Sequence, residues 1–359
     1  MSLLGRFWQS LVSDQAAYRP GAGPATAIDD HIRSQIREGD PGLAIAVVKA
    51  GVVVHRAGYG LADVRVGRPI RPETIFHLAS CGKQFTALGI LILAEQGRLN
   101  LDDPVSRHLP ALAAFGPQVT IRQLLQHTSG IRDLYDEEGT NELRRRCKQP
   151  TNADIIRTFA ELGCPMSGRR RRAGDVFSYS NSGYELLGSV IESVSGQSYH
   201  DFFQSRVFDR LAMTDTFSTP DPRVNDPRRA VGYTRGALGR MVPCSGTELD
   251  DLVGSGSFYT TVDDLCSYAL SSIALISAAS MRQALTSGRT NDGRDTGCGL
   301  GWFVASDESG TFADHEGEWD GFYSYICRYL DRPLSLFLLS NNPDLQLVDV
   351  ANVAISVHG

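Results

Sequence analysis

One short stretch of the chain carries a serine, a cysteine and a lysine within four positions. In "LASCGKQFTAL", residues 78–88, these are Ser80, Cys81 and Lys83. If a helix begins near Ser80, positions i and i+3 share a face, so Ser80 and Lys83 can touch. Cys81 would then lie about 200° around the helix from Lys83. This spacing favours Ser80 as a nucleophile and a desolvated Lys83 as its base. The alternative is an N-cap serine, a packed cysteine and a surface lysine.

Lysine is rare in this chain, which sharpens the question of Lys83. Of 35 basic residues only three are lysines, namely Lys49, Lys83 and Lys148. Arginine stays protonated in proteins, whereas a buried lysine can lose its proton. A lysine in a chain that otherwise uses arginine therefore favours a chemical role at position 83.

The stretch "FSYSNSGY", residues 177–184, places Tyr179 and Asn181 two positions apart in a loop before a helix. In an extended loop these side chains point the same way. A tyrosinate or a tyrosine hydroxyl at Tyr179 can relay a proton between Ser80 and a leaving group. The Asn181 amide can hold a substrate carbonyl and Lys83. The alternative is an aromatic anchor followed by an N-cap asparagine.

A third stretch, "DHEGEWDGF", residues 314–322, precedes a predicted strand. His315 can donate a hydrogen bond to the tyrosine oxygen or to substrate, and Gly317 lets a ligand lie close to the backbone. A metal site at His315, Glu316, Glu318 and Asp320 would lack a second histidine cluster, so we expect no metal. The sequence implies no cofactor.

Strand-like and helix-like patterns divide the chain into ends and middle. Hydrophobic periodicity predicts strands at both ends and helices between them, which indicates an α+β protein with one antiparallel sheet built from both termini and an inserted helical part. The predicted strands are a hairpin at 42–60, then 299–305, 322–330 and 334–341. The predicted helices are 26–38, 85–97, 153–163, 181–196, 260–273 and about 345–357.

The composition of the chain limits the classes of binding partner and the cellular compartment that we expect. A net charge of −6 argues against a nucleic-acid binder. No apolar run reaches the roughly 18–20 residues of a membrane span. The first 21 residues predict a short amphipathic helix instead of a secretion signal. Seven scattered cysteines without a C-x-x-C pair favour reduced thiols, so we expect a cytoplasmic protein. The oligomeric state stays open.

The three ordered motifs resemble the serine β-lactamase and penicillin-binding-protein superfamily. The pattern is Ser-x-x-Lys at Ser80, Tyr-x-Asn at Tyr179 and His-x-Gly at His315. "IFHLASCGKQFTALGILILAEQGRLNLDDPV" and "GDVFSYSNSGYELLGSVIESVSGQSY" resemble the class-C-like branch, which includes D-alanyl-D-alanine carboxypeptidases, D-aminopeptidases and carboxylesterases. The resemblance implies an N-terminal extension at 1–25 and one catalytic domain at 26–359. Within that domain it implies an α/β part at about 26–95 and 290–359, and a helical part at about 96–289.

The resemblance also implies roles for the residues. Ser80 would form an acyl-enzyme, Lys83 and Tyr179 would relay protons, and Asn181 would contact substrate. His315 stands where many relatives have the lysine of a Lys-Thr-Gly motif.

The resemblance also implies which groups form the oxyanion hole. It would consist of the backbone N–H groups of Ser80 and of Glu318, which is one residue past Gly317 on the edge strand.

The third motif departs from the family pattern, and this shapes the expected function. Glu316 and Glu318 flank Gly317, where carboxypeptidase-like relatives often have a threonine that binds a carboxylate. Two acids would repel a carboxylate, although on a strand both can point to solvent. We expect the substrate to be a small amide or a short peptide that contains a D-residue. A carboxylic ester is the second expectation, and a β-lactam or a D-alanyl-D-alanine peptide is the third. A catalytically silent penicillin-binding-type protein is the alternative of another class.

Two other stretches are less informative. "HTSG", residues 127–130, is interpreted as structural. The arginine run at 169–172 is interpreted as a solvated loop, with attraction of an anionic substrate as the alternative.

Overall fold

The computed structural model describes residues 24–135, 137–163, 172–271 and 274–359. Almost all of the predicted extension at 1–25, including its amphipathic helix, lies outside the described residues. Most of the arginine run at 169–172 also lies outside them.

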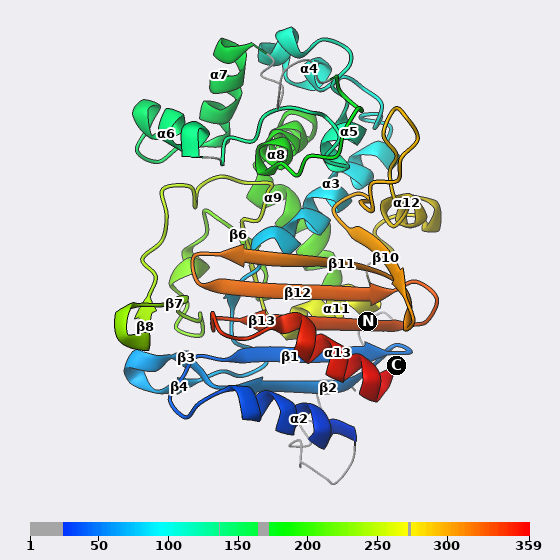
Figure 1. Cartoon of the computed structure of the whole chain (residues 1–359). Helices are drawn as coiled ribbons and strands as arrows, with labels where there is room; N and C mark the ends of the chain where they lie inside the picture. Colours follow the sequence, from blue (N-terminus) through cyan, green and yellow to red (C-terminus); the bar gives the residue numbers. More distant parts are fainter. Residues whose placement is uncertain (1–23, 136, 164–171, 272–273) are drawn as a thin grey trace.

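One antiparallel sheet of six strands is built from both ends of the chain, as predicted (Figure 1). The first and last segments meet where β1 pairs with β13, with Leu43 opposite Ser340 and Lys49 opposite Leu334. The strands, in spatial order, are β10 (Phe303–Asp307), β11 (Gly310–Trp319), β12 (Phe322–Tyr329), β13 (Leu334–Ser340), β1 (Leu43–Lys49) and β2 (Val52–Tyr59).

Helices cover both faces of this sheet. The first described helix, α2 (Pro24–Gln35), packs with the last, α13 (Leu347–His358), on one face. Ile28 and Ile32 of α2 are fully buried there, because their spacing puts both on one side of the helix. On the other face, α11 (Val262–Ser271) packs against β1 and β13. The sheet is therefore the middle layer of three.

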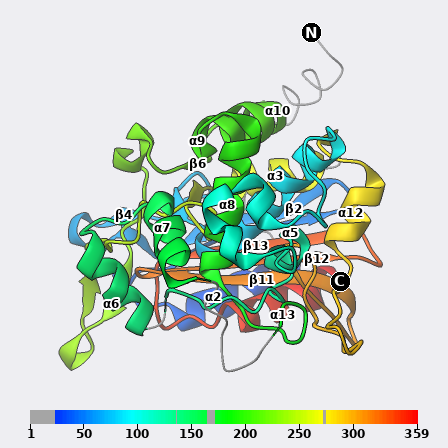
Figure 2. The same ribbon diagram turned by 90° about the horizontal axis from the view of Figure 1, so that it is seen from above.

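The buried helix α3 (Lys83–Glu95) connects the sheet layer to the helical part. It rises from behind the sheet and packs against α8 (Asn181–Ser195), as both views show (Figures 1 and 2). The predicted helices at 85–97 and 181–196 match these two elements. The other helices and helical turns of this part include α4 (Val105–His108), η3 (Pro110–Phe115), α5 (Ile121–Leu125), α6 (Glu137–Arg146), α7 (Asn152–Leu162), α9 (Tyr199–Phe203), α10 (Asp209–Leu211) and α12 (Ala278–Ala284).

Short strands also occur within and just before the part predicted to be helical. They have two or three residues each, which is too short to leave a periodic signal in the sequence. They are β3 (Leu61–Asp63) with β4 (Arg68–Pro69), β5 (Phe76–His77) with β9 (Phe258–Thr260) and β6 (Phe217–Ser218), and β7 (Tyr233–Arg235) with β8 (Met241–Pro243). The domain boundaries expected from the sequence stay a prediction.

The predicted strand at 299–305 begins only at Phe303. Gly301 has φ 76°, and a Cβ atom there would lie 2.7 Å from the carbonyl oxygen of Lys83. The segment before Phe303 therefore runs against the start of α3 instead of pairing in the sheet. Within the described ranges, no helix is both long and apolar enough to cross a membrane.

Candidate active site

The stretch that contains Ser80 is a 3-10 turn, η2 (Ala79–Gly82), and α3 begins only at Lys83. The contact of Ser80 with Lys83 was expected from a helix that begins near Ser80, and the helix itself was predicted at 85–97. In a 3-10 turn, residues i and i+3 are eclipsed, so the expected contact still forms. The Nζ atom of Lys83 lies 3.0 Å from the Oγ atom of Ser80.

Two hydrogen bonds attach the turn to the sheet. The Sγ atom of Cys81 donates to the carbonyl oxygen of His315 at 2.9 Å, and the Oγ atom of Ser324 donates to the carbonyl oxygen of Leu78 at 2.7 Å. Burial raises the pKa of the Cys81 thiol to about 12. Cys81 is therefore a packed thiol that helps position Ser80, and it cannot supply a thiolate near neutral pH.

Lys83 is fully buried, and three acceptors surround its Nζ atom. Besides Ser80, it donates to Oδ1 of Asn181 at 2.8 Å and to the carbonyl oxygen of Ser255 at 2.6 Å. Burial lowers the pKa of the Lys83 ammonium to about 7, although Asp133 and Glu185 raise it in part. A neutral amine is thus accessible at physiological pH, as a base for Ser80 requires.

Tyr179 and Asn181 flank the residue that caps α8. The cap is Ser180, whose Oγ atom accepts from the N–H of Gly183 at 3.0 Å, so Asn181 is not the N-cap. Because Oδ1 of Asn181 accepts from Lys83, its amide nitrogen is left to donate toward the adjoining cavity, which Asn181 lines. The placement agrees with a substrate-contacting role for Asn181.

The Tyr179 ring stacks on His127, with ring centres 4.4 Å apart and planes inclined by 28°. Burial raises the pKa of the Tyr179 hydroxyl, although a hydrogen bond with Ser80 lowers it in part. Tyr179 is consequently a phenol near neutral pH, and the tyrosinate alternative is disfavoured.

His127 holds the loop that contains Tyr179 through two hydrogen bonds. Its Nδ1 atom accepts from the N–H of Ser180 at 3.0 Å, and its carbonyl oxygen accepts from the N–H of Ser178 at 2.7 Å. Burial lowers the pKa of His127 well below its usual value, so the ring is neutral. The geometry agrees with the structural interpretation of "HTSG".

His315 is buried beside these groups, but its hydrogen bonding differs from the expectation. Its Nδ1 atom lies 2.5 Å from the carbonyl oxygen of Glu316, which can only accept, so Nδ1 carries the proton. Burial, together with the charge of Lys83, lowers the pKa of His315 to about 3. The Nε2 atom is therefore an acceptor, and the neutral ring cannot donate to Tyr179 or substrate from that side. The expected donor role is disfavoured for this reason.

Gly317 brings the β11 backbone against the Ser80 turn. A Cβ atom at Gly317 would lie 2.4 Å from Oγ of Ser324, 2.8 Å from the carbonyl oxygen of Leu78 and 3.0 Å from the backbone nitrogen of Ser80. Only glycine permits this approach. β11 is not an edge strand along its whole length, because β10 pairs with its residues 310–314. On the side of β11 where β10 lies, the second half of β11 has no partner among the described strands.

The register of the hairpin aims the Glu318 N–H outward. A two-residue turn at 320–321, with both φ angles positive, joins Trp319 to Phe322. In such a hairpin the flanking pair is hydrogen-bonded and the next pair, Glu318 with Tyr323, is not. The N–H of Glu318 therefore points away from β12, toward the open edge beside Ser80. This is the geometry that an oxyanion hole made by Ser80 and Glu318 requires.

Glu316 and Glu318 lie on the opposite face of β11 from His315 and Gly317. Burial alternates along the strand, with His315 and Gly317 buried and both glutamates exposed. Their carboxylates thus point to solvent at the rim of the site, and they leave this rim acidic.

A cavity of about 150 Å³ opens beside Ser80. Tyr135, Asn181 and Ser255 line it from the helical side, and Glu318 with Trp319 lines it from the sheet. On the other side of Ser80 a second hollow is lined by Tyr179, Phe303, Asp314, His315 and Glu316. Ser80 thus lies between two spaces that can hold the two halves of a substrate.

A family model for β-lactamase matches residues 28–358. The chain belongs to the β-lactamase family. Penicillin-binding protein 4* of Bacillus subtilis (strain 168) is 33% identical over 314 residues, which are 84% of this chain and 68% of that protein. Protein flp of Staphylococcus aureus (strain NCTC 8325 / PS 47) is 31% identical over 327 residues, which are 88% of this chain and 62% of that protein.

A solved structure agrees with this assignment. The structure of the octameric penicillin-binding protein homologue from Pyrococcus abyssi has a TM-score of 0.80 and 27% identity, and the match covers 92% of this chain and 76% of that one. The predicted resemblance and the α+β fold are therefore confirmed. The chain spans about two thirds of the length of the two curated relatives.

In this β-lactamase-family chain, sequence reasoning missed a buried carboxyl group close to Lys83. The Oγ atom of Ser255, whose carbonyl accepts from Lys83, donates to Oε1 of Glu185 at 3.3 Å, and Tyr135 donates to the same oxygen. Burial raises the pKa of Glu185 to about 8, although Tyr135 lowers it in part. The available signal was a glutamate four positions after Asn181, on the buried face of an apolar helix.

Within the described part of the β-lactamase-like chain, no group of three or more histidine, cysteine, aspartate or glutamate side chains is placed to hold a metal ion.

Proposed function

We propose that this chain is a serine hydrolase that forms an acyl-enzyme at Ser80 and acts on small amides or peptides containing D-amino acids. The observation that supports it most is the buried contact of 3.0 Å between Lys83 and Ser80, at a lysine whose pKa is lowered to about 7. A nucleophile and a base within hydrogen-bond reach make up the core of covalent catalysis.

In the acylation step, the neutral amine of Lys83 takes the proton of the Ser80 hydroxyl while Oγ attacks the substrate carbonyl. The negative charge that develops on the carbonyl oxygen is held by the N–H groups of Ser80 and Glu318. Removing one such donor from an acyl-transfer enzyme typically costs about 10²–10³ in kcat. The Asn181 amide nitrogen contacts the acyl part of the substrate.

The leaving group takes its proton from the Tyr179 hydroxyl, which Lys83 resupplies. Tyr179 is suited to this as a neutral phenol that shares a hydrogen bond with Ser80. In deacylation a water molecule follows the same path in reverse and releases the acid from Ser80.

The preference for substrates that carry an amine over substrates that carry a carboxylate rests on the third motif. His315 is neutral because its pKa is lowered to about 3, so no cation stands where many relatives have lysine. Glu316 and Glu318 place negative charge at the rim. A carboxylate would be repelled there, whereas an amine is attracted. The preference for a D-residue rests on the family resemblance.

A carboxylic ester is the second candidate substrate, since an ester needs no charged partner and the neutral His315 offers none. β-Lactams and D-alanyl-D-alanine peptides carry a carboxylate and rank lower for the reason just given. A catalytically silent protein would have no use for a lysine with a lowered pKa.

The test compares D- and L-aminoacyl anilides, short-chain p-nitrophenyl esters and nitrocefin on one preparation, with intact-mass detection of the acyl-enzyme. We expect the highest kcat/KM for a D-aminoacyl anilide. Ser80→Ala should abolish turnover and the mass adduct, whereas Cys81→Ala, which removes a positioning hydrogen bond but no reacting group, should still form the adduct and retain measurable turnover. Equal turnover by Ser80→Ala would refute the nucleophile, and the absence of any adduct on the native chain would favour the silent protein.

A further inference from the structure

A larger hollow of about 580 Å³, distinct from the one at Tyr179 and His315, adjoins the cavity at Ser80. The two spaces share three residues in their walls, namely His77, Asp250 and Trp319. The Trp319 indole N–H donates to Oδ1 of Asp250 at 2.8 Å, which fixes this shared wall. The larger hollow is therefore an extension of the cleft that begins at Ser80.

The walls of this hollow carry an excess of negative charge. Asp250, Asp251 and Asp320 line it, and among the described residues none of the three forms an ion pair. The one basic side chain among its lining residues, Arg229, donates to the carbonyl oxygen of Val224 and lies over the ring of Tyr259. The balance within the lining stays acidic.

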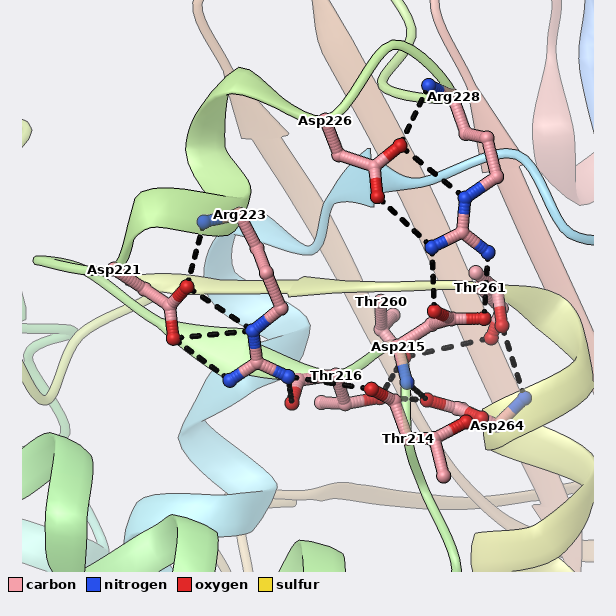
Figure 3. A network of polar contacts seen from close by, with 10 residues as sticks. All are labelled: Thr214, Asp215, Thr216, Asp221, Arg223, Asp226, Arg228, Thr260, Thr261 and Asp264. Atoms are coloured by element: carbon pink, nitrogen blue, oxygen red, sulfur yellow. Dashed lines mark hydrogen bonds and ion pairs between the residues drawn. The ribbon is translucent and has the colours of Figure 1, made fainter.

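The fourth lining acid is neutralised and structural. Asp221 accepts from the backbone and the guanidinium of Arg223, in the network that Figure 3 shows. In the same network Arg228 bridges Asp215 and Asp226. These ion pairs fix the loop that forms the outer wall of the hollow, so the wall is preformed.

His77 places a hydrogen-bond donor in the shared wall. The side chain is 8% exposed, and its Nδ1 atom accepts from the N–H of Ala79 at 3.1 Å, so the proton is on Nε2. Burial lowers the pKa of His77 to about 4, which keeps the ring neutral. In the described part of the chain, Nε2 has no acceptor. Because His77 lines both spaces, its Nε2 atom is open to the cleft and can donate to a substrate oxygen there.

The proposed mechanism determines whether the leaving group or the acyl part of the substrate reaches the larger hollow. The leaving group must lie near Tyr179, which lines the separate hollow with His315. The acyl part then lies on the side of Asn181, and from there the cleft continues past His77.

We propose that the larger hollow is a subsite for a cationic amine carried on the acyl part of the substrate, several atoms beyond the scissile carbonyl. This inference rests on the proposed function, because it assumes acylation of Ser80. Asp251 and Asp320 supply the attraction, and His77 donates to an oxygen of the acyl chain on the way to the subsite.

The experiment compares two p-nitrophenyl esters of equal length, 6-aminohexanoyl and heptanoyl, which differ in a terminal ammonium or methyl group. The native chain should prefer the 6-aminohexanoyl ester by at least about fivefold in kcat/KM. The double variant Asp251→Asn, Asp320→Asn should lose most of that preference and keep kcat/KM for the heptanoyl ester within about twofold. Asparagine tolerates the left-handed conformation of residue 320, whose φ is 44°.

Glu308→Gln, in an exposed turn away from the hollow, is the matched control and should keep the native preference. The preference should also shrink at high salt, because exposed carboxylates are screened. A native ratio near one, or an unchanged ratio in a double variant that melts at the native temperature, would overturn the subsite. If the heptanoyl ester acylates Ser80 but no preference exists, the subsite alone fails. If neither ester acylates Ser80, the proposed function fails and the subsite with it.

Discussion

The ammonium nitrogen of Lys83 lies 3.0 Å from the hydroxyl oxygen of Ser80, at a position where Lys83 is fully buried. All its other hydrogen bonds go to uncharged oxygens, those of Asn181 and Ser255. A charge that has lost water and gained only neutral partners is destabilised, which is why the pKa falls to about 7. The relationship between these two residues therefore carries the chemistry proposed for the site.

Lys83→Arg tests whether the lysine must lose its proton. Arginine keeps the charge but does not deprotonate in proteins. General-base catalysis contributes about 10²–10⁴-fold, so kcat/KM should fall by about that factor. The matched control is Lys49→Arg, at an exposed lysine on β1, which should keep the native rate. A Lys83→Arg enzyme that is folded and retains more than a tenth of the native rate would contradict the role of Lys83 as base.

The pH dependence of kcat/KM should show an acidic limb with an apparent pKa near 7. Below this pH Lys83 is protonated and cannot accept the serine proton, so activity falls as the pH falls. His77 and His315 cannot produce this limb, because burial lowers the pKa of these rings to about 4 and about 3. A profile that is flat between pH 5 and 9 would exclude Lys83 as the titrating base.

Glu185→Gln tests the buried carboxyl group as a positioning residue for Lys83. The glutamine keeps an oxygen for Ser255 and Tyr135, but it removes the negative charge that Glu185 carries when ionised and that raises the pKa of Lys83. Because burial raises the pKa of Glu185 to about 8, only a minor fraction of this group is ionised near pH 7. The acidic limb should therefore shift only slightly to lower pH, with a loss of kcat of less than about tenfold.

Glu308→Gln, in an exposed turn, serves as the charge-removal control and should leave the limb in place. A purely structural role of Glu185 would lower the melting temperature without moving the limb. Disappearance of the limb would assign the titration to Glu185 itself.

Gly317→Ala tests the close approach of β11 to the nucleophile turn. The added Cβ would lie 3.0 Å from the backbone nitrogen of Ser80 and 2.8 Å from the carbonyl oxygen of Leu78. Because either the strand or the turn must shift, the oxyanion donors separate, and kcat should fall by at least about 10². The circular dichroism spectrum reports whether the fold is retained, and KM reports whether substrate binding is affected. Glu316→Ala, the neighbour whose side chain is exposed, is the control expected to stay within about tenfold of native activity.

Local patterns were enough to predict much of the framework. The spacing of Ile28 and Ile32 predicted the first helix, and both are fully buried. The hairpin at 42–60 was visible in the sequence because a short connection joins two β-rich runs. The contact of Ser80 with Lys83 was also local, since a separation of three residues places them together in an α-helix or a 3-10 turn.

Properties that depend on residues far apart in the chain could not be predicted. The tautomer and neutrality of His315 follow from a carbonyl contact and burial, and neither has a sequence signature. The path from Lys83 through Ser255 to Glu185 joins three distant segments.

The sequence by itself determined the contact of Ser80 with Lys83, the order of the three motifs and the construction of the sheet from both ends. These depend on residue type and on periodicity along a few turns. Only the tertiary structure decided that the third motif lacks a positive charge, that the Glu318 N–H faces Ser80, and that the cleft continues past His77 into an acidic hollow. The reason is physical, because desolvation and cavity walls arise only when distant segments pack together.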